Sequence, residues 1–179
     1  MGTLAEGQIR LARPEDLDEV MALYDRARAF MRAHGNSAQW TGGYPFRALA
    51  EEDCAAGHLW VLEGAHGEKD DGAADSTPAL LAVMTVLSGP DPTYAEIAGK
   101  PWLNDEPYTV MHRLAVGESG HGAGGRCLAW LCAQHDNVRA DTHELNEPMQ
   151  RALERAGFVR RGTITLGDGS PRVAYHFVR

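Results

Sequence analysis

The sequence lacks any apolar run long enough to cross a membrane, and its N-terminal stretch MGTLAEGQIR lacks the apolar core of a signal peptide. It also lacks a basic segment: no run of lysine and arginine occurs, and the formal net charge is −8 at pH 7. An acidic chain of this kind is a poor partner for nucleic-acid phosphates and for anionic membrane surfaces. We therefore expect a cytoplasmic protein with neither nucleic acid nor membrane as a partner.

Cysteine is scarce as well. Cys54, Cys127 and Cys132 are odd in number and include no CxxC pair, which favours free thiols in a reducing compartment over a disulfide framework. Histidines at the HxH or HxxxH spacing of a metal site are also missing. A metal hydrolase is therefore a weak alternative, and we expect no metal, although four histidines would be its candidate ligands: His112, His121, His135 and His143.

The length of 179 residues predicts one domain, 1–179, with an ordinary globular composition of 44% hydrophobic residues. Hydrophobic periodicity predicts an α/β plan around a mixed sheet. The expected strands are 8–12, 58–63, 79–87, 108–116, 138–142, 158–166 and 173–178, and the expected helices are 14–34, 45–56, 126–135 and 147–156, with a short helical patch near 93–98.

The most informative stretch is 108–132, YTVMHRLAVGESGHGAGGRCLAWLC. A buried strand there runs into a glycine-rich turn at 117–125, and helical spacing begins at Arg126. Such a unit can cradle phosphates, because the first N–H groups of a helix have no partner within it and glycine lets a diphosphate approach them. The stretch has neither the Gly-Lys-Ser/Thr of a P-loop nor the third glycine of GxGxxG. A plain flexible turn before the helix is the alternative.

Two motifs carry a family resemblance. The segment HRLAV at 112–116, followed by SGHGAG at 119–124, resembles the signature of the GNAT superfamily of N-acetyltransferases, with Ser119 where the family usually has arginine or glutamine. Asn146-x-x-Met149, followed by the Ala-Gly-Phe at 156–158, resembles the later Asn-x-x-Ala and Gly-Phe segment of that family. The nearest likeness is to a small sub-branch with GNxxQW, HR(L/I)A, DTH and DGSPR motifs, which implies no defined acceptor.

The resemblance implies a GNAT fold: an α/β protein with a central mixed, mostly antiparallel sheet that is splayed at the signature strand and flanked by helices. It implies transfer of an acetyl or short acyl group from acetyl-CoA to a primary amine of a small molecule or peptide. The strand at 138–142 would be the one splayed away, and a homodimer is allowed for. The implied cofactor-binding residues are Leu114, Ala115, Val116, Ser119, Gly120, His121, Gly122, Ala123, Gly124, Gly125, Asn146 and Met149.

The groups that would move protons are less clearly marked. Leu153 stands where many members of the family have a tyrosine as general acid. On the predicted strand face, which comprises Tyr108, Val110, His112, Leu114 and Val116, His112 alone titrates near neutral pH. We take His112 and Tyr175 as catalytic candidates. The alternatives are a core histidine held by a hydrogen bond, a structural Tyr175, and a water chain as the base.

Three residues are candidates for binding the acceptor amine: Gln39, Trp40 and His143. An exposed tryptophan in a glycine-rich loop either packs against the core beneath the loop or forms a wall of the acceptor site.

A different class of function is also possible for this sequence. A GNAT fold can bind acyl-CoA without transferring the acyl group, as a sensor or regulatory module, and release of free thiol with an amine separates the two.

Overall fold

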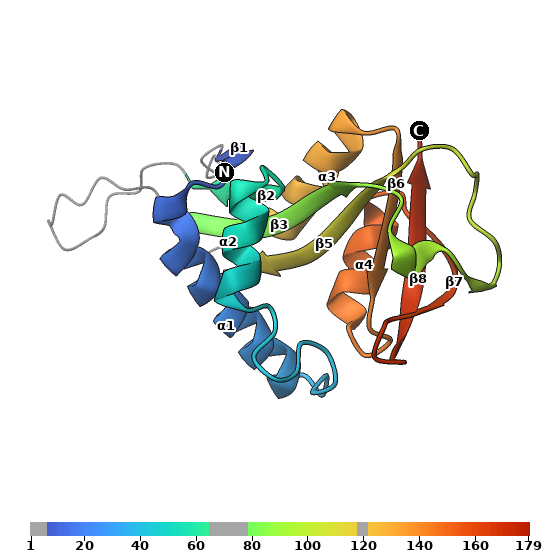
Figure 1. Cartoon of the computed structure of the whole chain (residues 1–179), viewed down its shortest axis with the longest axis horizontal. Coiled ribbons are helices and arrows are strands. Elements are labelled where there is room, and N and C mark those ends of the chain that lie inside the picture. The colour runs from blue at the N-terminus through green and yellow to red at the C-terminus, as the bar shows by residue number, and fades with distance from the viewer. Residues whose placement is uncertain (1–6, 65–78, 118–121) are drawn as a thin grey trace, which may run out of the picture.

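We describe the protein from a computed structural model, which covers residues 7–64, 79–117 and 122–179 (Figure 1). The strands are β1 (Gln8–Leu11), β2 (Leu59–Glu63), β3 (Leu80–Ser88), β4 (Ala98–Gly99), β5 (Thr109–Val116), β6 (Asn137–Thr142), β7 (Val159–Thr165) and β8 (Pro171–Val178). The helices are α1 (Leu17–Ala33), α2 (Arg47–Ala55), α3 (Ala123–Gln134) and α4 (Glu147–Arg155), and the 3₁₀ turns are η1 (Pro14–Asp16) and η2 (Pro92–Tyr94). None of these helices has the length and apolar character needed to span a bilayer.

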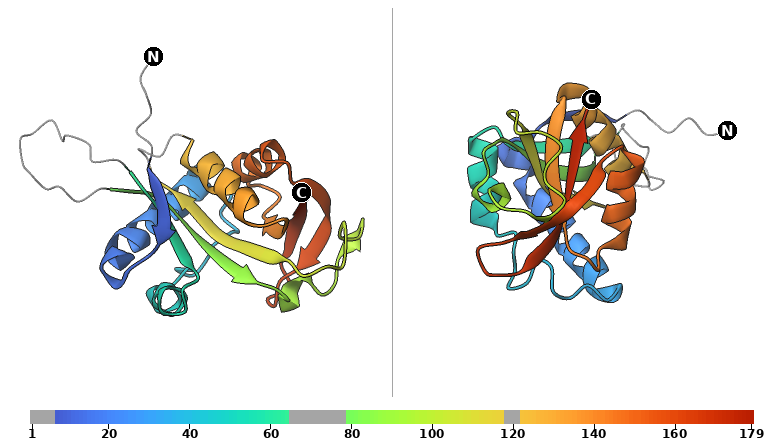
Figure 2. Two further views of the ribbon diagram at one scale, coloured as in Figure 1. Left: turned by 90° about the horizontal axis from the view of Figure 1, so that it is seen from above. Right: turned by 90° about the vertical axis from the view of Figure 1, so that its right-hand side faces the viewer.

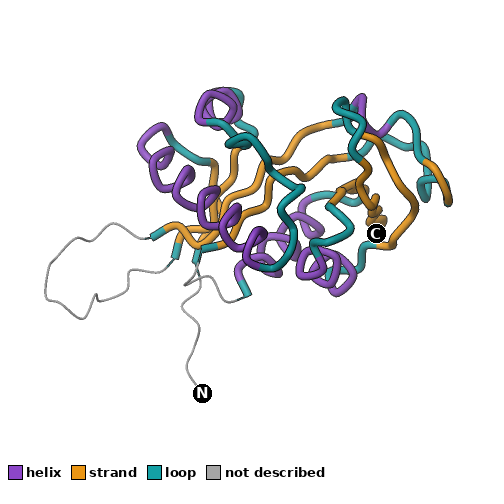
Figure 3. The backbone as a smooth tube through the Cα atoms, turned by 90° about the horizontal axis from the view of Figure 1, so that it is seen from below, coloured by secondary structure: helices purple, strands orange, loops and turns teal. Residues whose placement is uncertain are grey.

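The strands form one sheet in the order β1-β2-β3-β5-β6-β8-β7-β4. Every neighbouring pair is antiparallel except β5 and β6, which are parallel. Helices α1 and α2 pack on one face and α3 and α4 on the other, as the views from above and below show (Figures 2 and 3). The expected fold class, a mixed and mostly antiparallel sheet flanked by helices, is confirmed.

The core is divided by the sheet. One cluster joins β2, β3 and β5 to α1 through Leu23, Tyr24 and Ala115, and a second joins the sheet to α3 and α4 through Leu128 and Leu153. A third, smaller cluster comprises Tyr94, Val110, Ile164 and Ala174. The amphipathic pattern of α1 explains its place, because its buried residues recur at helical spacing along one side: Leu17, Val20, Leu23, Tyr24 and Met31. Each sheet face thus has its own hydrophobic support.

Helix α3 begins earlier than the sequence indicated. Gly122 caps the helix in the left-handed region, with φ of 78°, and Ala123, Gly124 and Gly125 form the first turn, so the predicted start at Arg126 was wrong. A Cβ at Gly124 would lie 3.5 Å from Cγ2 of Val116 and 4.0 Å from Cδ2 of Leu114. The glycines therefore belong to the helix and bring its N-terminus close to β5.

The segment between β3 and β5 also differs from the prediction. Its helical part is the single 3₁₀ turn η2, which ends at Tyr94 and does not extend to residue 98. Ala98 and Gly99 form the short strand β4, which pairs with β7 and was not predicted. A strand of two residues is too short to produce a periodicity in the sequence.

The expected splay lies between β5 and β6. These strands pair over only three positions, Thr109 with Val138, Val110 with Arg139 and Met111 with Ala140. Residues 112–116 of β5 continue along β3, whereas β6 continues to Thr142 along β8. Within the described ranges, the edge of residues 112–116 that faces away from β3 has no strand partner, and the two strands diverge in the ribbon views (Figures 1 and 2).

A β-bulge marks the start of the unpaired stretch. Val83 pairs with Ala115 and Thr85 with His112, so Met84 faces two residues, Arg113 and Leu114. Arg113 has φ of 55°, in the region that non-glycine residues rarely adopt. The extra residue shifts the alternation of side chains along β5.

The shift corrects the predicted strand face. Met111 belongs to the cluster on the α3 side, and Leu114 and Val116 pack against that same cluster. Val110 packs with Tyr94 on the opposite side, where His112 also meets the Tyr94 ring. The prediction that Leu114 and Val116 share a face with Val110 and His112 was therefore wrong, because strict alternation does not survive a bulge.

Candidate active site

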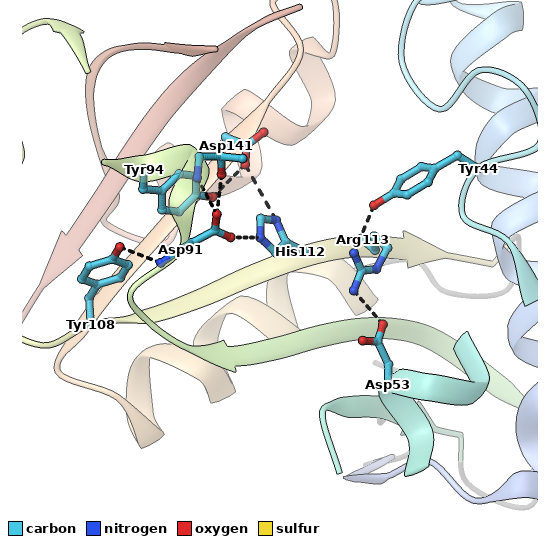
Figure 4. Close-up of polar contacts among 9 residues, drawn as sticks. Tyr44, Asp53, Asp91, Tyr94, Tyr108, His112, Arg113 and Asp141 are labelled. Carbon is cyan, nitrogen blue, oxygen red and sulfur yellow. Dashed lines mark hydrogen bonds and ion pairs between the residues drawn. The ribbon is translucent and has the colours of Figure 1, made fainter. Parts of the chain in front are cut away.

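His112 lies at the point where β5 leaves β6, and two carboxylates flank it (Figure 4). Its Nε2 is 2.8 Å from Oδ2 of Asp91, which follows β3, and its Nδ1 is 3.8 Å from Oδ1 of Asp141 on β6. A carboxylate accepts hydrogen bonds and donates none, so Nε2 carries the proton of the short contact. In the neutral imidazole, Nδ1 is then the atom with a free lone pair.

Asp91 is held in place from several directions. Its Oδ1 accepts hydrogen bonds from the backbone N–H of Thr93, at 2.8 Å, and from the Thr93 hydroxyl, at 2.6 Å. Its own backbone N–H donates to the hydroxyl of Tyr108. The hydrogen bond with His112, followed by those from Thr93, holds the pKa of Asp91 well below its usual range. Asp91 is therefore an anion that fixes the orientation of the imidazole.

Asp141 has a different set of partners. Its Oδ1 accepts a hydrogen bond of 2.7 Å from the hydroxyl of Tyr94, and the contact to His112 converges on that same oxygen (Figure 4). Burial, together with the charge of Asp141, raises the pKa of Tyr94 well above its usual value, so Tyr94 stays a hydrogen-bond donor. The side chain of Asp141 is 12% exposed and that of His112 is 21% exposed, so both remain within reach of a ligand.

The segment that positions Asp91 and Tyr94 is anchored to the sheet. Arg139 of β6 stacks on the rings of Trp102 and Tyr108, with its guanidinium carbon 4.4 and 3.9 Å from the ring centroids. His176 of β8 accepts a hydrogen bond of 2.9 Å from the backbone N–H of Leu103. A hollow of about 400 Å³ beside η2 is lined by residues of 92–98 together with Thr163 and Thr165 of β7.

Arg113 occupies the neighbouring position on β5. Its guanidinium donates to Asp53 of α2 at 2.6 Å and to the Tyr44 hydroxyl at 3.0 Å, and the side chains of Arg113 and Asp53 are each 10% exposed (Figure 4). Asp53 also accepts from the Thr85 hydroxyl. This buried ion pair ties the bulge to α2 and to the loop before it.

The residues expected to hold the cofactor are largely brought together. Leu114 and Val116 lie under the first turn of α3, where Gly122, Ala123, Gly124 and Gly125 offer N–H groups without a partner inside the helix. Ala115 differs, because its side chain is buried on the α1 side, so only its backbone can face the free edge. Ser119, Gly120 and His121 lie outside the described residues.

Asn146 caps α4, as expected, and also reaches across to the loop after α1. Its Oδ1 accepts from the backbone N–H of Met149 at 3.3 Å, and its Nδ2 donates to Oε1 of Gln39 at 3.1 Å. The same Gln39 oxygen accepts from Asn36, which is buried. The structure thus joins two predicted site residues, Gln39 and Asn146, that are 107 positions apart in the sequence.

Trp40 has both a packing role and a place near the site. Its ring meets that of Tyr24 edge to face at 5.6 Å and that of Tyr44 at 6.4 Å, and it packs against the cluster under α1. It is only partly buried, with φ of 57°. The packing role is therefore present, and the partial exposure beside Tyr44 leaves Trp40 as a candidate wall of the acceptor site.

The two other candidates, Tyr175 and His143, form no hydrogen bond with His112 among the described residues. Tyr175 is fully buried among residues that face α3 and α4, and its hydroxyl contacts Gln150 and Glu154, while burial raises its pKa to about 12. Its neighbour Ala174 packs with Tyr94 on the opposite face, so the structure does not bring Tyr175 to His112. His143 is buried after β6 and accepts from the backbone N–H of Leu145, with its pKa lowered by burial.

Sequence reasoning missed Asp91 and Asp141. Asp141 belongs to the DTH motif that was singled out, but alternation alone gave it no role. Asp91 lies 21 positions before His112 in a proline-rich segment without periodicity. No signal in one sequence shows that Asp91 returns to β5. In the described part of the chain, no group of three His, Cys, Asp or Glu side chains forms a metal site.

Comparisons with solved structures agree with this geometry. A GNAT-family acetyltransferase from Streptococcus agalactiae has 33% sequence identity and a TM-score of 0.81, over 97% of this chain and 95% of that one. A GNAT-family acetyltransferase from Listeria monocytogenes has 18% identity and a TM-score of 0.67, over 98% and 96% of the two chains. An aminoglycoside acetyltransferase solved in complex with coenzyme A has 20% identity and a TM-score of 0.59, over 97% and 95%.

No protein-family model matches the chain, and no curated protein matches it by sequence. The sheet that opens at β5, beside a helix that begins with glycines, is the architecture of an acetyltransferase. At the identity and coverage of the Streptococcus agalactiae structure, the chain belongs to the GNAT family and is an N-acetyltransferase.

Proposed function

We propose that the protein transfers the acetyl group of acetyl-CoA directly to a primary amine of a small molecule or peptide. The observation that carries the proposal is the free edge of β5, which lies between the N-terminus of α3 and the His112–Asp91 pair. This arrangement can hold a thioester and an amine side by side, and proximity of that kind removes much of the barrier to acyl transfer.

The donor would use backbone groups more than side chains. The free edge of residues 114–116 can pair with the amide groups of the pantetheine arm, as a neighbouring strand would. The first turn of α3 can receive the pyrophosphate, because its N–H groups point out of the helix end and the helix dipole makes that end positive. Gly124 lacks a side chain where the turn faces Leu114 and Val116, so the turn lies close to β5, and a Cβ at Gly125 would meet nothing within 4 Å.

His112 is the proposed base. Because Nε2 donates to the Asp91 carboxylate, Nδ1 is the nitrogen that can take a proton from the acceptor ammonium. The imidazolium formed in this step would then lie between two carboxylates, Asp91 and Asp141, which stabilise its charge. The sequence led us to expect an apolar surrounding for His112, and the structure replaces it with this acidic one.

The proposed transfer begins at the ammonium group of the acceptor and ends with release of coenzyme A. The ammonium gives one proton to Nδ1, and the nitrogen lone pair then attacks the thioester carbonyl carbon. The tetrahedral intermediate collapses with cleavage of the C–S bond, and the products are the N-acetyl amide and the coenzyme A thiolate. The nitrogen loses its second proton to solvent, which leaves the amide product neutral. The thiolate takes up one proton from solvent, and the imidazolium releases its proton to solvent, so that one proton is set free per turnover.

A sensor that binds acyl-CoA without transferring it is the second candidate, favoured by one observation. Leu153, which stands at the usual place of the acid tyrosine, is fully buried and packs with the core between α4 and the sheet. No hydroxyl from that position can therefore protonate the leaving thiolate. Transfer remains the better-supported function, because a thiolate can be protonated by water whereas the ammonium needs a base.

The test is a screen of thiol release from acetyl-CoA with amines, polyamines, aminoglycosides, amino acids and peptides. N-acetyl products should be identified by mass spectrometry, because thiol release alone also reports hydrolysis. We expect an equal amount of thiol and N-acetyl product for at least one class of amine. Tight coenzyme A binding, with no N-acetyl product across the whole panel, would favour the sensor.

A further inference from the structure

Asp141 can accept hydrogen bonds beyond those that the proposed action of His112 as a base requires. Its Oδ1 lies 3.8 Å from Nδ1 of His112, which is too long for a hydrogen bond, while Nε2 of the same ring donates to Asp91. With the imidazole neutral, a carboxylate oxygen and a nitrogen lone pair face each other. Two acceptors placed so close repel each other unless a proton on Nδ1, a donor or a cation relieves the contact, and only a donor or cation from outside leaves Nδ1 free to act as the base.

A primary ammonium group fits this gap. It carries three N–H donors, so its nitrogen can lie within about 3 Å of both acceptors at the apex of a triangle. Oδ2 of Asp141 has no protein partner among the described residues and is not among the buried unpaired atoms, so it can receive a further N–H. The gap therefore lies where the proposed reaction needs the amine, next to the base.

The same surroundings disfavour a carboxylate on the carbon that bears the amine. Such a group would lie within a few ångströms of Asp91 and Asp141, and like charges at that range repel strongly in a partly buried site. Arg113 is the nearest cation on β5, and both its Nη groups are already used by Asp53 and Tyr44. Arg139 lies two positions before Asp141 on β6, but it is 4% exposed and its guanidinium lies over the rings of Trp102 and Tyr108. The Nε groups of both arginines are without a partner but buried, so neither presents an exposed pair of N–H donors to an α-carboxylate.

We infer that Asp141 binds the acceptor ammonium beside Nδ1 of His112 and selects amines that lack an α-carboxylate over the matching α-amino acids. This inference rests on the proposed transfer to an amine and adds the class of acceptor and the residue that selects it. Asp141 is thereby a specificity-determining residue, in addition to its hydrogen bond with Tyr94.

The experiment measures binding, so that it does not depend on turnover. Calorimetry on the protein saturated with coenzyme A should compare amines with the α-amino acids that differ only by the carboxylate: pentylamine with norleucine, phenylethylamine with phenylalanine, and histamine with histidine. We expect at least one amine to bind at least tenfold more tightly than its amino acid. Equal affinity within every pair, or no binding of any amine, would overturn the inference.

Three variants separate an ammonium contact from a structural role. Asp141→Asn keeps the shape and should weaken amine binding about tenfold or more, as expected for loss of a charged hydrogen bond, with coenzyme A affinity unchanged. Tyr94→Phe removes the hydrogen bond to Asp141 but leaves its charge, and should change amine affinity less than threefold. Asp136→Asn removes one charge from an exposed ion pair with Arg179 and controls for net charge.

Two results would overturn the role of Asp141: a loss in Tyr94→Phe equal to that in Asp141→Asn, or unchanged amine affinity in Asp141→Asn. The proposed function fails in a different way. If the amines bind in an Asp141-dependent manner and no N-acetyl product forms with acetyl-CoA, the acceptor assignment stands and the transfer does not.

Discussion

At the scale of single residues, Arg113 decides which side chains the signature strand presents. Its left-handed backbone inserts one extra residue into β5, so that His112 faces Asp91 and Asp141 while Leu114 turns toward α3. A regular strand would place His112 and Leu114 on one face. His112, which contacts Asp91, and the hydrophobic side chains beneath the proposed cofactor site, Leu114 and Val116, therefore lie on opposite faces of one strand.

The sequence identified His112 correctly as the titratable group of this strand but not its surroundings. Composition and spacing show that a histidine interrupts an apolar strand. They do not show a bulge, because a bulge depends on the register with β3. Nor do they show Asp91, whose distance to His112 depends on the path of the whole segment between β3 and β5.

The role of His112 can be tested by His112→Gln. The glutamine amide can still donate to Asp91 but cannot take a proton, so the fold and the affinity for coenzyme A should be kept while kcat falls about 10²-fold or more. The acidic limb of the pH–rate profile should flatten. Wild-type turnover with an unchanged pH dependence in His112→Gln would show that His112 is not the general base.

Asp91→Asn provides the companion measurement. An asparagine amide can donate to Nε2, which moves the imidazole proton to Nδ1 and removes the free lone pair. We therefore expect kcat to fall in Asp91→Asn as well. The change in the free energy of unfolding should be smaller than the change in activation free energy calculated from kcat. If Asp91→Asn keeps full activity, the orientation of His112 does not depend on this carboxylate.

At the scale of elements, the segment between β3 and β5 behaves as an anchored arm that carries Asp91 and Tyr94 to the site. His176 is one of its anchors: it is fully buried, its Nδ1 accepts from Leu103, and its Nε2 is 2.5 Å from Oδ1 of Asn137. Both contacts suit a neutral ring with the proton on Nε2. Burial, followed by the charges of Arg139 and Arg161, lowers the pKa of His176 to about 4.

This anchor predicts a dependence of stability on pH. Between the unfolded pKa of about 6.5 and the folded value of about 4, the unfolded chain binds a proton at His176 that the folded chain does not. The free energy of unfolding should therefore fall by roughly 2–3 kcal/mol from this residue as the pH decreases across that range. Urea unfolding at pH 7 and pH 4.5 measures the change.

The matched control is His176→Gln, which cannot take up a proton. The variant should be less stable than the wild type at pH 7, because the anchor is weakened, but it should lose less stability on acidification. An equal loss in both proteins would show that other groups cause the acid sensitivity.

The start of α3 shows how far local sequence signals extend. Three glycines at 122, 124 and 125 indicate a turn by propensity, and the helix nevertheless includes two of them. Packing explains the difference, since a Cβ at Gly124 would already lie in van der Waals contact with Val116, and the glycine lets the first turn of α3 lie close to β5. Tertiary contact overrides propensity here.

At the scale of the whole molecule, the order of the helices and of every strand except β4 was predicted from the sequence, and the opening in the sheet was predicted from the family likeness. The eight strands, the parallel pair and the splay all serve one result, an unpaired stretch of β5 near the centre of the sheet. The net charge of −8 adds a weak, salt-sensitive attraction for cationic acceptors. Local patterns could not show that Gln39 and Asn146 meet across this opening.

The central claim is that acetyl-CoA lies along the free edge of β5 with its pyrophosphate at the first turn of α3. The most direct test is the equilibrium binding of coenzyme A, measured by calorimetry, to Gly124→Glu, Gly124→Ala and Ala133→Glu. Gly124→Ala adds only a Cβ in ordinary contact, 3.5 Å from Val116, and Ala133→Glu places the same charge on an exposed position near the other end of α3.

Gly124→Glu adds a carboxylate to the first turn of α3, beside the N–H groups that are proposed to bind the pyrophosphate. The account predicts that this variant loses coenzyme A affinity by at least a hundredfold, while Gly124→Ala and Ala133→Glu stay within about threefold of the wild type. Circular dichroism should confirm that all three variants fold. Coenzyme A affinity in a folded Gly124→Glu protein equal to that of Gly124→Ala would contradict the account.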